Sequence, residues 1–117
     1  MKLTIGKETG SPGVPQFRPG DKIPAHVEYD YKGLDQDAKL TFSIGTGVYP
    51  TYNVKNTWPD VTIALEGSMD WLGRSIDAQF TIPTTMAKGT YSARVRLKTV
   101  TKVTEETDTE WGALEIV

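Results

Sequence analysis

The residues of this chain that could carry out acid–base or nucleophilic chemistry are few. Among its 117 residues there is one histidine, His26, and there is no cysteine. One imidazole cannot supply a two-histidine zinc site, and without cysteine there are no thiolate ligands, thiol nucleophiles or disulfides. No G-x-S-x-G, P-loop or H-E-x-x-H pattern is present. We therefore expect no catalytic residue, no cofactor and no enzyme activity.

Carboxylates are the second group with possible chemistry, because the loops of β-sandwiches often hold calcium. Asp35 and Asp37 stand two residues apart in the stretch LDQDAK. Three further acidic residues lie near the ends of predicted strands, namely Asp60, Glu66 and Asp70. Calcium needs about six to eight converging oxygen ligands, and the sequence has no EF-hand pattern. Solvated turn residues are the favoured interpretation, so we expect no metal site.

Aromatic residues outside the alternating patterns are the best functional lead. Tyr49, Tyr52 and Trp58 fall in the long segment GTGVYPTYNVKNTWPD, and Trp71 falls in GSMDWLG, a predicted loop. Exposed loop aromatics suit stacking on sugar rings or anchoring a protein partner, and these four are the predicted ligand- or partner-binding residues. The alternative for each ring is that it closes an open end of the fold. Trp58 and Trp71 flank a strand of roughly 23 Å, which would send them to opposite ends.

The charge balance excludes one class of partner. The net charge of −2 lacks the basic excess needed to neutralise phosphates, so we expect no nucleic-acid partner. Arg94, Arg96 and Lys98 do form a basic stripe on one predicted strand. Cross-strand ion pairs can account for this stripe, since the predicted hairpin partner carries Glu105, Glu106, Glu110 and Glu115.

Membrane and secretion signals are also lacking in the sequence. The apolar runs are only a few residues long, so no membrane span is predicted. The N-terminal residues have no apolar core before glycine and proline intervene, and we expect no signal peptide. The localisation stays open, and a virion or a cell surface is compatible with it.

The elements that must position these residues are β-strands. Apolar and polar residues alternate in seven segments, at 2–6, 22–31, 38–44, 61–65, 76–82, 91–98 and 109–117, and a short extra strand is predicted around 48–54. His26 falls on the outward face of its strand and is predicted to be a surface histidine without a role. In the last strand Trp111 and Leu114 fall on opposite faces, which predicts a bulge near Gly112. The chain is expected to be one all-β domain, a sandwich or a small barrel.

The stretch Gly89 to Ala93 resembles the tyrosine corner of immunoglobulin domains. In that motif a tyrosine two residues before a cysteine bonds back to the backbone of the preceding corner. Gly89 and Tyr91 match it, whereas Ala93 stands at the cysteine position and its partner would be Ala25 or Val27. The segment FRPGDKIPAHVEYDYKG is also similar to the second-strand entry of bacterial, archaeal and phage immunoglobulin-like modules. The resemblance implies an immunoglobulin-like or fibronectin-type sandwich of seven to eight antiparallel strands without the disulfide.

The functional expectation follows mainly from elimination. We expect a non-catalytic structural or adhesion module that docks within a larger assembly such as a phage virion or a cell surface. The alternative is a carbohydrate-binding module in which Tyr49, Tyr52 and Trp58 form the platform, with Asn53, Asn56 or Asp60 as hydrogen-bond partners. The expected partner is therefore a protein of an assembly or a glycan. Exposed first and last strands would also permit an oligomer through edge pairing.

Overall fold

The computed structural model of the chain describes residues 1–6, 15–33, 36–65, 67–99 and 105–117. These residues form no helix, and so none that could cross a membrane. They form nine strands: β1 (Lys2–Ile5), β2 (Gln16–Phe17), β3 (Lys22–Gly33), β4 (Gln36–Thr46), β5 (Asn53–Thr57), β6 (Val61–Leu65), β7 (Ser68–Thr81), β8 (Gly89–Thr99) and β9 (Glu105–Ile116). The all-β prediction is confirmed, and the described part of the chain has more strands than the seven to eight expected.

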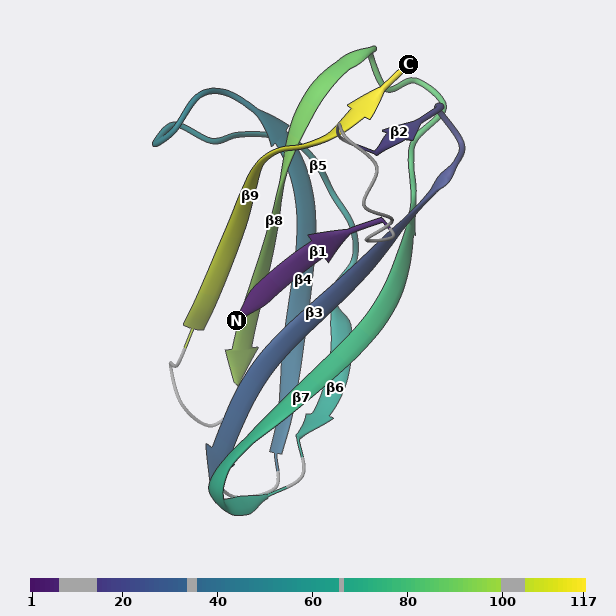
Figure 1. The fold of residues 1–117 in the computed structure, drawn as a ribbon. Coiled ribbons are helices and arrows are strands. Elements are labelled where there is room, and N and C mark those ends of the chain that lie inside the picture. The colour runs from purple at the N-terminus through teal and green to yellow at the C-terminus, as the bar shows by residue number, and fades with distance from the viewer. Residues whose placement is uncertain (7–14, 34–35, 66, 100–104) are drawn as a thin grey trace.

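The strands form two sheets that stack against each other (Figure 1). One sheet has the order β1-β3-β7, and the other has the order β2-β9-β8-β4-β5 with β6 also paired to β4. All pairs are antiparallel except β2 with β9, which is parallel. The turn-rich segment before β3 makes a short parallel ladder with β9. It does so over two residues, because Phe17 O accepts the Val117 amide and Pro15 O accepts the Glu115 amide.

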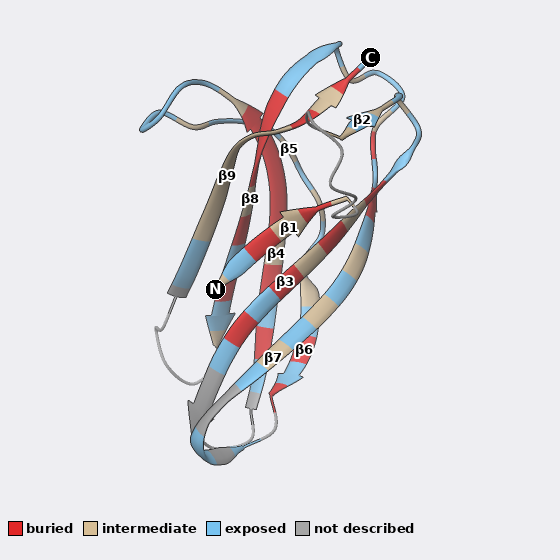
Figure 2. Cartoon of the chain, in the orientation of Figure 1, coloured by how far each residue is buried: buried red, intermediate tan, exposed pale blue. Residues whose placement is uncertain are grey.

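Alternation of apolar residues builds the core between the sheets, which Figure 2 shows as buried bands along β3, β4 and β8. Phe42 of β4 and Phe80 of β7 stack across the sandwich with ring centroids 4.3 Å apart. The largest side chains that are almost fully buried are Phe42, Leu3, Ile23, Leu40, Ile44, Leu65, Ile82, Leu114, Ile116 and Val95. Burial of these chains supplies the main folding free energy in a protein without cysteine.

Tyr91 makes the hydrogen bond that the sequence motif predicts. Its ring is buried at the start of β8, and its hydroxyl donates to the backbone carbonyl of Ala87 at 2.7 Å. A buried phenol needs such a partner because leaving its hydroxyl without one would cost free energy. The bond ties the turn before β8 to the strand itself.

The bulge predicted near Gly112 is confirmed. Tyr91 lies opposite Leu114 and Ala93 lies opposite Glu110, so three residues of β9 face Ser92 alone. Gly112 has a φ of +59°, a conformation that glycine adopts without strain, and its amide donates to Ser92 Oγ at 3.0 Å. The two extra residues leave the phase of β9 unchanged, because Glu110 and Leu114, on either side of the bulge, both lie opposite inward residues of β8. Leu114 is buried in the core, and Trp111 lies on the outer face.

Two predicted boundaries are wrong. The stretch GSMDWLG is not a loop, because β3 continues to Gly33 and offers ladder partners to β7 as far as Ser68. The extra strand lies later than expected, since residues 47–52 form the connection between β4 and β5. Of the predicted carboxylate candidates, Asp35 and Glu66 lie outside the described residues.

Candidate functional site

The connection between β4 and β5 is a tight hairpin loop that projects beyond the sheet (Figure 1). Thr46 pairs with Asn53 at its base, and the Thr51 amide donates to the Val48 carbonyl at 2.8 Å. A Cβ on Gly45 would lie only 2.3 Å from the Asn53 carbonyl oxygen, so this backbone approach requires glycine. At the tip, Val48 is 82% exposed and Tyr49 is 75% exposed.

A cluster of aromatic rings braces this loop against the outer face of the second sheet. The edge-on packing of Tyr49 and Tyr52 on Trp111 of β9 gives centroid distances of 5.7 and 6.2 Å. The guanidinium of Arg94 on β8 lies 4.1 Å from the centroid of the Tyr52 ring. We call Tyr49, Tyr52, Trp111 and Arg94 the aromatic cluster. It joins residues from three separate segments of the chain, which holds the loop in one orientation.

Hydrogen bonds fix the base of the aromatic cluster. The hydroxyls of Tyr52 and Ser43 are 2.9 Å apart, and either oxygen can donate. Arg94 Nε donates to Thr109 Oγ1 of β9 at 2.8 Å, which orients the guanidinium over Tyr52. Burial raises the pKa of the Tyr52 hydroxyl, opposed by the Ser43 hydrogen bond and the Arg94 charge, so Tyr52 is neutral at physiological pH.

The four predicted binding residues are not brought to one place. Tyr49 and Tyr52 belong to the aromatic cluster, whereas Trp58 packs on Phe42 and Phe80 at centroid distances of 5.2 and 5.7 Å. The Trp58 indole nitrogen also donates to the Thr81 carbonyl at 2.9 Å. Trp58 therefore closes the side of the sandwich between β4 and β7, as the alternative interpretation of these rings expected.

Trp71 lies near the start of β7, where this strand pairs with the C-terminal end of β3. The side chain of Trp71 is outside the described part of the structure. Thr81, which Trp58 contacts, is ten residues further along the same strand, a separation of roughly 33 Å. The predicted separation of the two tryptophans is thus confirmed at the level of the backbone.

Trp111 was not among the predicted binding residues. The sequence placed it on the face of its strand opposite Leu114, but two further facts decide its contacts. One is the strand order β9-β8-β4-β5, and the other is the bulge of β9 opposite Ser92. The bulge is predicted from the sequence, but the strand order depends on pairing between distant segments, which local alternation does not reveal.

The register agrees with the predicted ion pairs of the basic stripe at one position only, where Lys98 lies opposite Glu105. The register places Thr109 opposite Arg94 and Thr107 opposite Arg96, while Glu106 and Glu110 lie opposite the inward residues Leu97 and Ala93. Those two carboxylates therefore face β1 at the margin between the sheets. The bulge in β9 and the length of the hairpin shift the pairing relative to the simple expectation.

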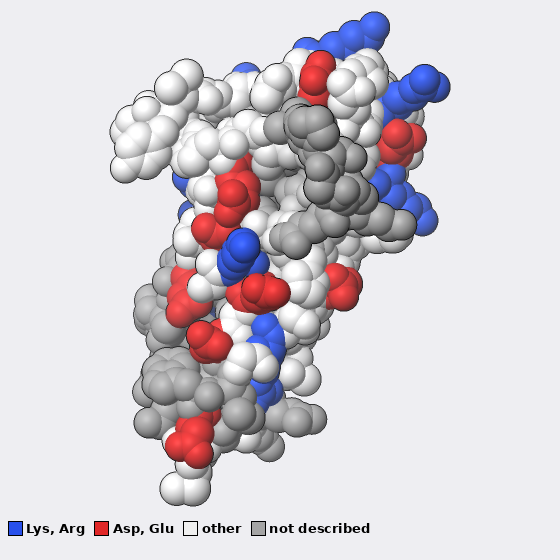
Figure 3. All heavy atoms as spheres, in the orientation of Figure 1, with Lys and Arg blue, Asp and Glu red and all other residues white. Residues whose placement is uncertain are grey.

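A row of carboxylates on β9 faces β1 at that margin, and Figure 3 shows acidic side chains gathered on this face of the molecule. Asp108 Oδ2 accepts the Leu3 amide at 2.8 Å, and Glu106 lies 4.0 Å from the amino group of Met1. Burial raises the pKa of Glu110, and its hydrogen bond to Asp108 and the Asp108 charge add to this effect. The row holds β1 in place at its unpaired edge.

His26 is a half-buried histidine between two carboxylates on the outer face of the first sheet. Its Nδ1 is 2.6 Å from Asp77 Oδ1, and its Nε2 is 3.5 Å from Glu28 Oε1. The Asp77 hydrogen bond raises the pKa of His26 above its usual value of 6.5. Over the residues that the structure describes, no three His, Asp or Glu side chains gather in a way that could hold a metal ion.

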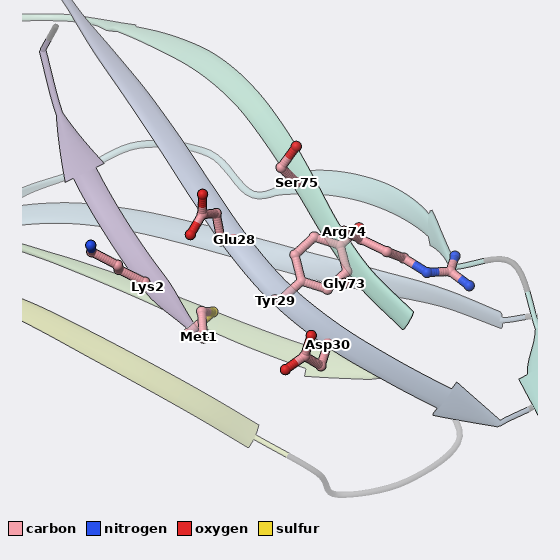
Figure 4. Close-up of a pocket in the computed structure, with 8 residues that line it drawn as sticks. All are labelled: Met1, Lys2, Glu28, Tyr29, Asp30, Gly73, Arg74 and Ser75. Carbon is pink, nitrogen blue, oxygen red and sulfur yellow. The ribbon is translucent and has the colours of Figure 1, made fainter. Parts of the chain in front are cut away.

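An open hollow of about 490 Å³ lies where β1 begins beside β3 and β7 (Figure 4). Its charged lining residues are Lys2, Glu28, Asp30 and Arg74. Glu28 pairs with Ser75 on the outer face and Arg74 pairs with Tyr29 on the inner face, so Figure 4 shows Arg74 directed away from Glu28. Glu28 and Arg74 therefore do not converge in the hollow.

No protein-family model and no curated protein matches the chain. Among solved structures it is similar to Spo0M, a sporulation control protein from Bacillus subtilis, with a TM-score of 0.51 and 13% sequence identity. The match covers 99% of this chain and 49% of Spo0M, so the chain spans about half the length of that protein. The comparison shows an all-β fold in common with Spo0M.

Proposed function

We propose that this chain is a non-catalytic binding module that docks on a partner protein through the tip of the β4–β5 loop. The observation that carries the proposal is the exposure of Val48 and Tyr49 on a loop that the aromatic cluster holds in place. Residues 47–53 contain no charged side chain, and the loop is uncharged in Figure 3. A preorganised apolar tip suits insertion into a pocket of a partner, because little conformational entropy remains to be lost.

Docking on protein is favoured over binding of sugar by the orientation of the rings. Trp111 makes interplanar angles of 82° with Tyr49 and 84° with Tyr52, so the three rings do not form a flat platform for a pyranose. The Arg94 guanidinium already covers one face of Tyr52. Tyr49 is the one member of the cluster that is largely exposed.

A capture experiment with matched variants tests the proposed function. The whole chain is immobilised and exposed to an extract of the organism that encodes it, as wild type, Tyr49→Ala and Met69→Ala. Met69 is 91% exposed on β7 and serves as the apolar control remote from the loop. We expect a protein that the wild type and Met69→Ala capture equally and Tyr49→Ala does not. Equal capture by all three would contradict the proposal, and Tyr49-dependent capture of polysaccharide would support the sugar alternative.

We also propose that the sandwich is immunoglobulin-like. The order β1-β3-β7 matches the A-B-E part of one immunoglobulin sheet, and β4, β8 and β9 match strands C, F and G of the other. The Tyr91 hydrogen bond to Ala87 lies where that family has its tyrosine corner. Inter-strand nuclear Overhauser effects in solution test the assignment. Contacts between β4 and β8 and between β3 and β7 support it, and a different strand order would overturn it.

A further inference from the structure

The edge of β7 away from β3 is unpaired in the described part of the chain, since β7 ends its sheet. Ile82 donates its amide to Asp21 on the β3 side, whereas the Thr81 carbonyl accepts the Trp58 indole on the other side. Backbone groups of successive strand residues point to alternate edges. The pairing with β3 has no shift between residues 72 and 81. It follows that the N–H and C=O groups of Gly73, Ser75, Asp77 and Gln79 point outward from the free edge.

Apolar side chains lie beside this free edge. Ile76 and Ala78 are half-buried residues of β7 that pack on the core from its margin, and Val61 of β6 does the same on the facing sheet. In Figure 1, β7 forms the margin of its sheet with β6 behind it. A strand added beside β7 would satisfy the outward backbone groups and cover Ile76 and Ala78.

Features that protect natural edges are sparse here. Residues 75–79 contain no proline and no lysine, and the pairing of β7 shows no bulge in this stretch. The Trp58 indole covers the edge only at Thr81. About five residues of strand are therefore open to pairing, a length common for strands in sheets.

We propose that this edge pairs with β7 of a second copy of the chain, antiparallel and about a two-fold axis at Ile76. In this register Ser75 lies opposite Asp77 of the second copy, and Gly73 lies opposite its Gln79. The two Ile76 side chains meet on the inner side. Ser75 and Asp77 are both exposed and both turn their backbone groups outward, so each serine hydroxyl can donate to the opposing carboxylate, whose Oδ1 also contacts His26 Nδ1.

Charge disfavours one of the two neighbouring registers. An axis at Asp77 would set two carboxylates directly opposite each other, which is unfavourable. With the axis at Ile76 no like charges are directly opposed, and Arg74 lies opposite the small side chain of Ala78. The edge is thus complementary to itself, which is why a second copy is the occupant that we infer. This interface is independent of the β4–β5 loop.

Sedimentation velocity of the whole chain, from about 10 µM to about 1 mM, measures the association. We expect a monomer–dimer equilibrium that Ser75→Lys tightens and Ser75→Asp weakens, each by roughly two- to tenfold, because two equivalent pairs with Asp77 form in each dimer. Ser75→Pro should abolish the dimer, since it removes an outward amide and leaves the β3 ladder intact. Ser75→Ala keeps that amide and is the control that still associates.

Near-ultraviolet circular dichroism of each variant confirms that it is folded before its association is compared. Ser75→Lys and Ser75→Asp change an exposed side chain only, so the test holds even if the proline variant does not fold. A wild type that stays monomeric at about 1 mM, or a dimer whose dissociation constant is the same in all variants, would overturn the inference. Loss of binding through Tyr49 alone would leave it unaffected.

Discussion

The guanidinium of Arg94 lies 4.1 Å from the centroid of the Tyr52 ring while its Nε donates to Thr109 Oγ1 at 2.8 Å. One side chain of β8 thus links the loop before β5 to β9. Lysine cannot reproduce both contacts, because its ammonium lacks the planar group that stacks on a ring. The orientation of the docking loop depends on this arrangement.

Arg94→Lys should therefore loosen the aromatic cluster and cost about 0.5 to 1 kcal/mol in the free energy of unfolding. Labelling with fluorotryptophan and assignment by Trp111→Phe allow the Trp111 signal to be followed by fluorine NMR. We expect this signal to shift in Arg94→Lys and to stay unchanged in Arg96→Lys, a control on the same face of β8. An unchanged Trp111 signal in Arg94→Lys would show that the cluster does not depend on the guanidinium.

Gly45→Ala should disrupt the base of the loop. The new Cβ would lie 2.3 Å from the Asn53 carbonyl oxygen and 3.0 Å from a ring carbon of Tyr52, so the β4–β5 pairing must shift. Overpacking of this kind costs about 2 kcal/mol, measured by chemical denaturation. Gly73→Ala is the matched control, because its Cβ would meet only Asp30 Oδ1 at an ordinary 3.5 Å. Equal stabilities for the two variants would contradict the close approach at Gly45.

His26 should make stability depend on pH around neutrality. The hydrogen bond to Asp77 raises the pKa of His26 in the folded state. The contribution of His26 to the free energy of unfolding is therefore fully present below the unfolded-state pKa near 6.5, and it is lost as pH rises through the folded-state pKa. We expect His26→Gln to lower the melting temperature more at about pH 5.5 than at about pH 8.5. An NMR titration of the imidazole gives the pKa directly, and a value below 6.5 would contradict the Asp77 contact.

The effect of Glu110 on stability should depend on pH in the opposite direction to that of a salt-bridged acid. Burial and Asp108 raise its pKa, so the folded state favours the protonated form and stability falls as pH rises through the folded pKa. Glu110→Gln removes the like charge beside Asp108 and should raise the melting temperature at pH 7 but little at about pH 4. Glu115→Gln on the same strand is the charge-matched control. A lower melting temperature for Glu110→Gln at pH 7 would show that its carboxylate is stabilising there.

Local sequence patterns predicted those parts of the fold that depend on neighbouring residues. Alternation located β3, β4, β6 and β8 within a few residues, and the placement of Trp111 and Leu114 on opposite faces led to the prediction of the bulge. The start of β7 was missed because its pairing partner is the distant end of β3. The parallel pairing of β2 was missed because two residues carry no periodic signal and because the partner strand, β9, is distant in the sequence.

The candidate site was predicted only in part, for a related reason. Tyr49 and Tyr52 were found because aromatic residues in a glycine-rich connection stand outside any alternating pattern. Trp58 also stands outside any alternating pattern. It nevertheless packs against the core, because it contacts the rings of Phe42 and Phe80 and donates to the Thr81 carbonyl. Trp111 and Arg94 join the cluster through the strand order, which a pattern of local alternation does not contain.

Site-specific photocrosslinking is the most direct measurement of the central claim, which is docking through the tip of the β4–β5 loop. A benzophenone amino acid replaces Tyr49 in one variant and Met69 in another, and both are irradiated in cells of the organism that encodes the chain. We predict a discrete protein adduct from position 49 and none of the same mass from position 69. The same adducts from both positions, or no protein adduct from position 49, would contradict the proposed function.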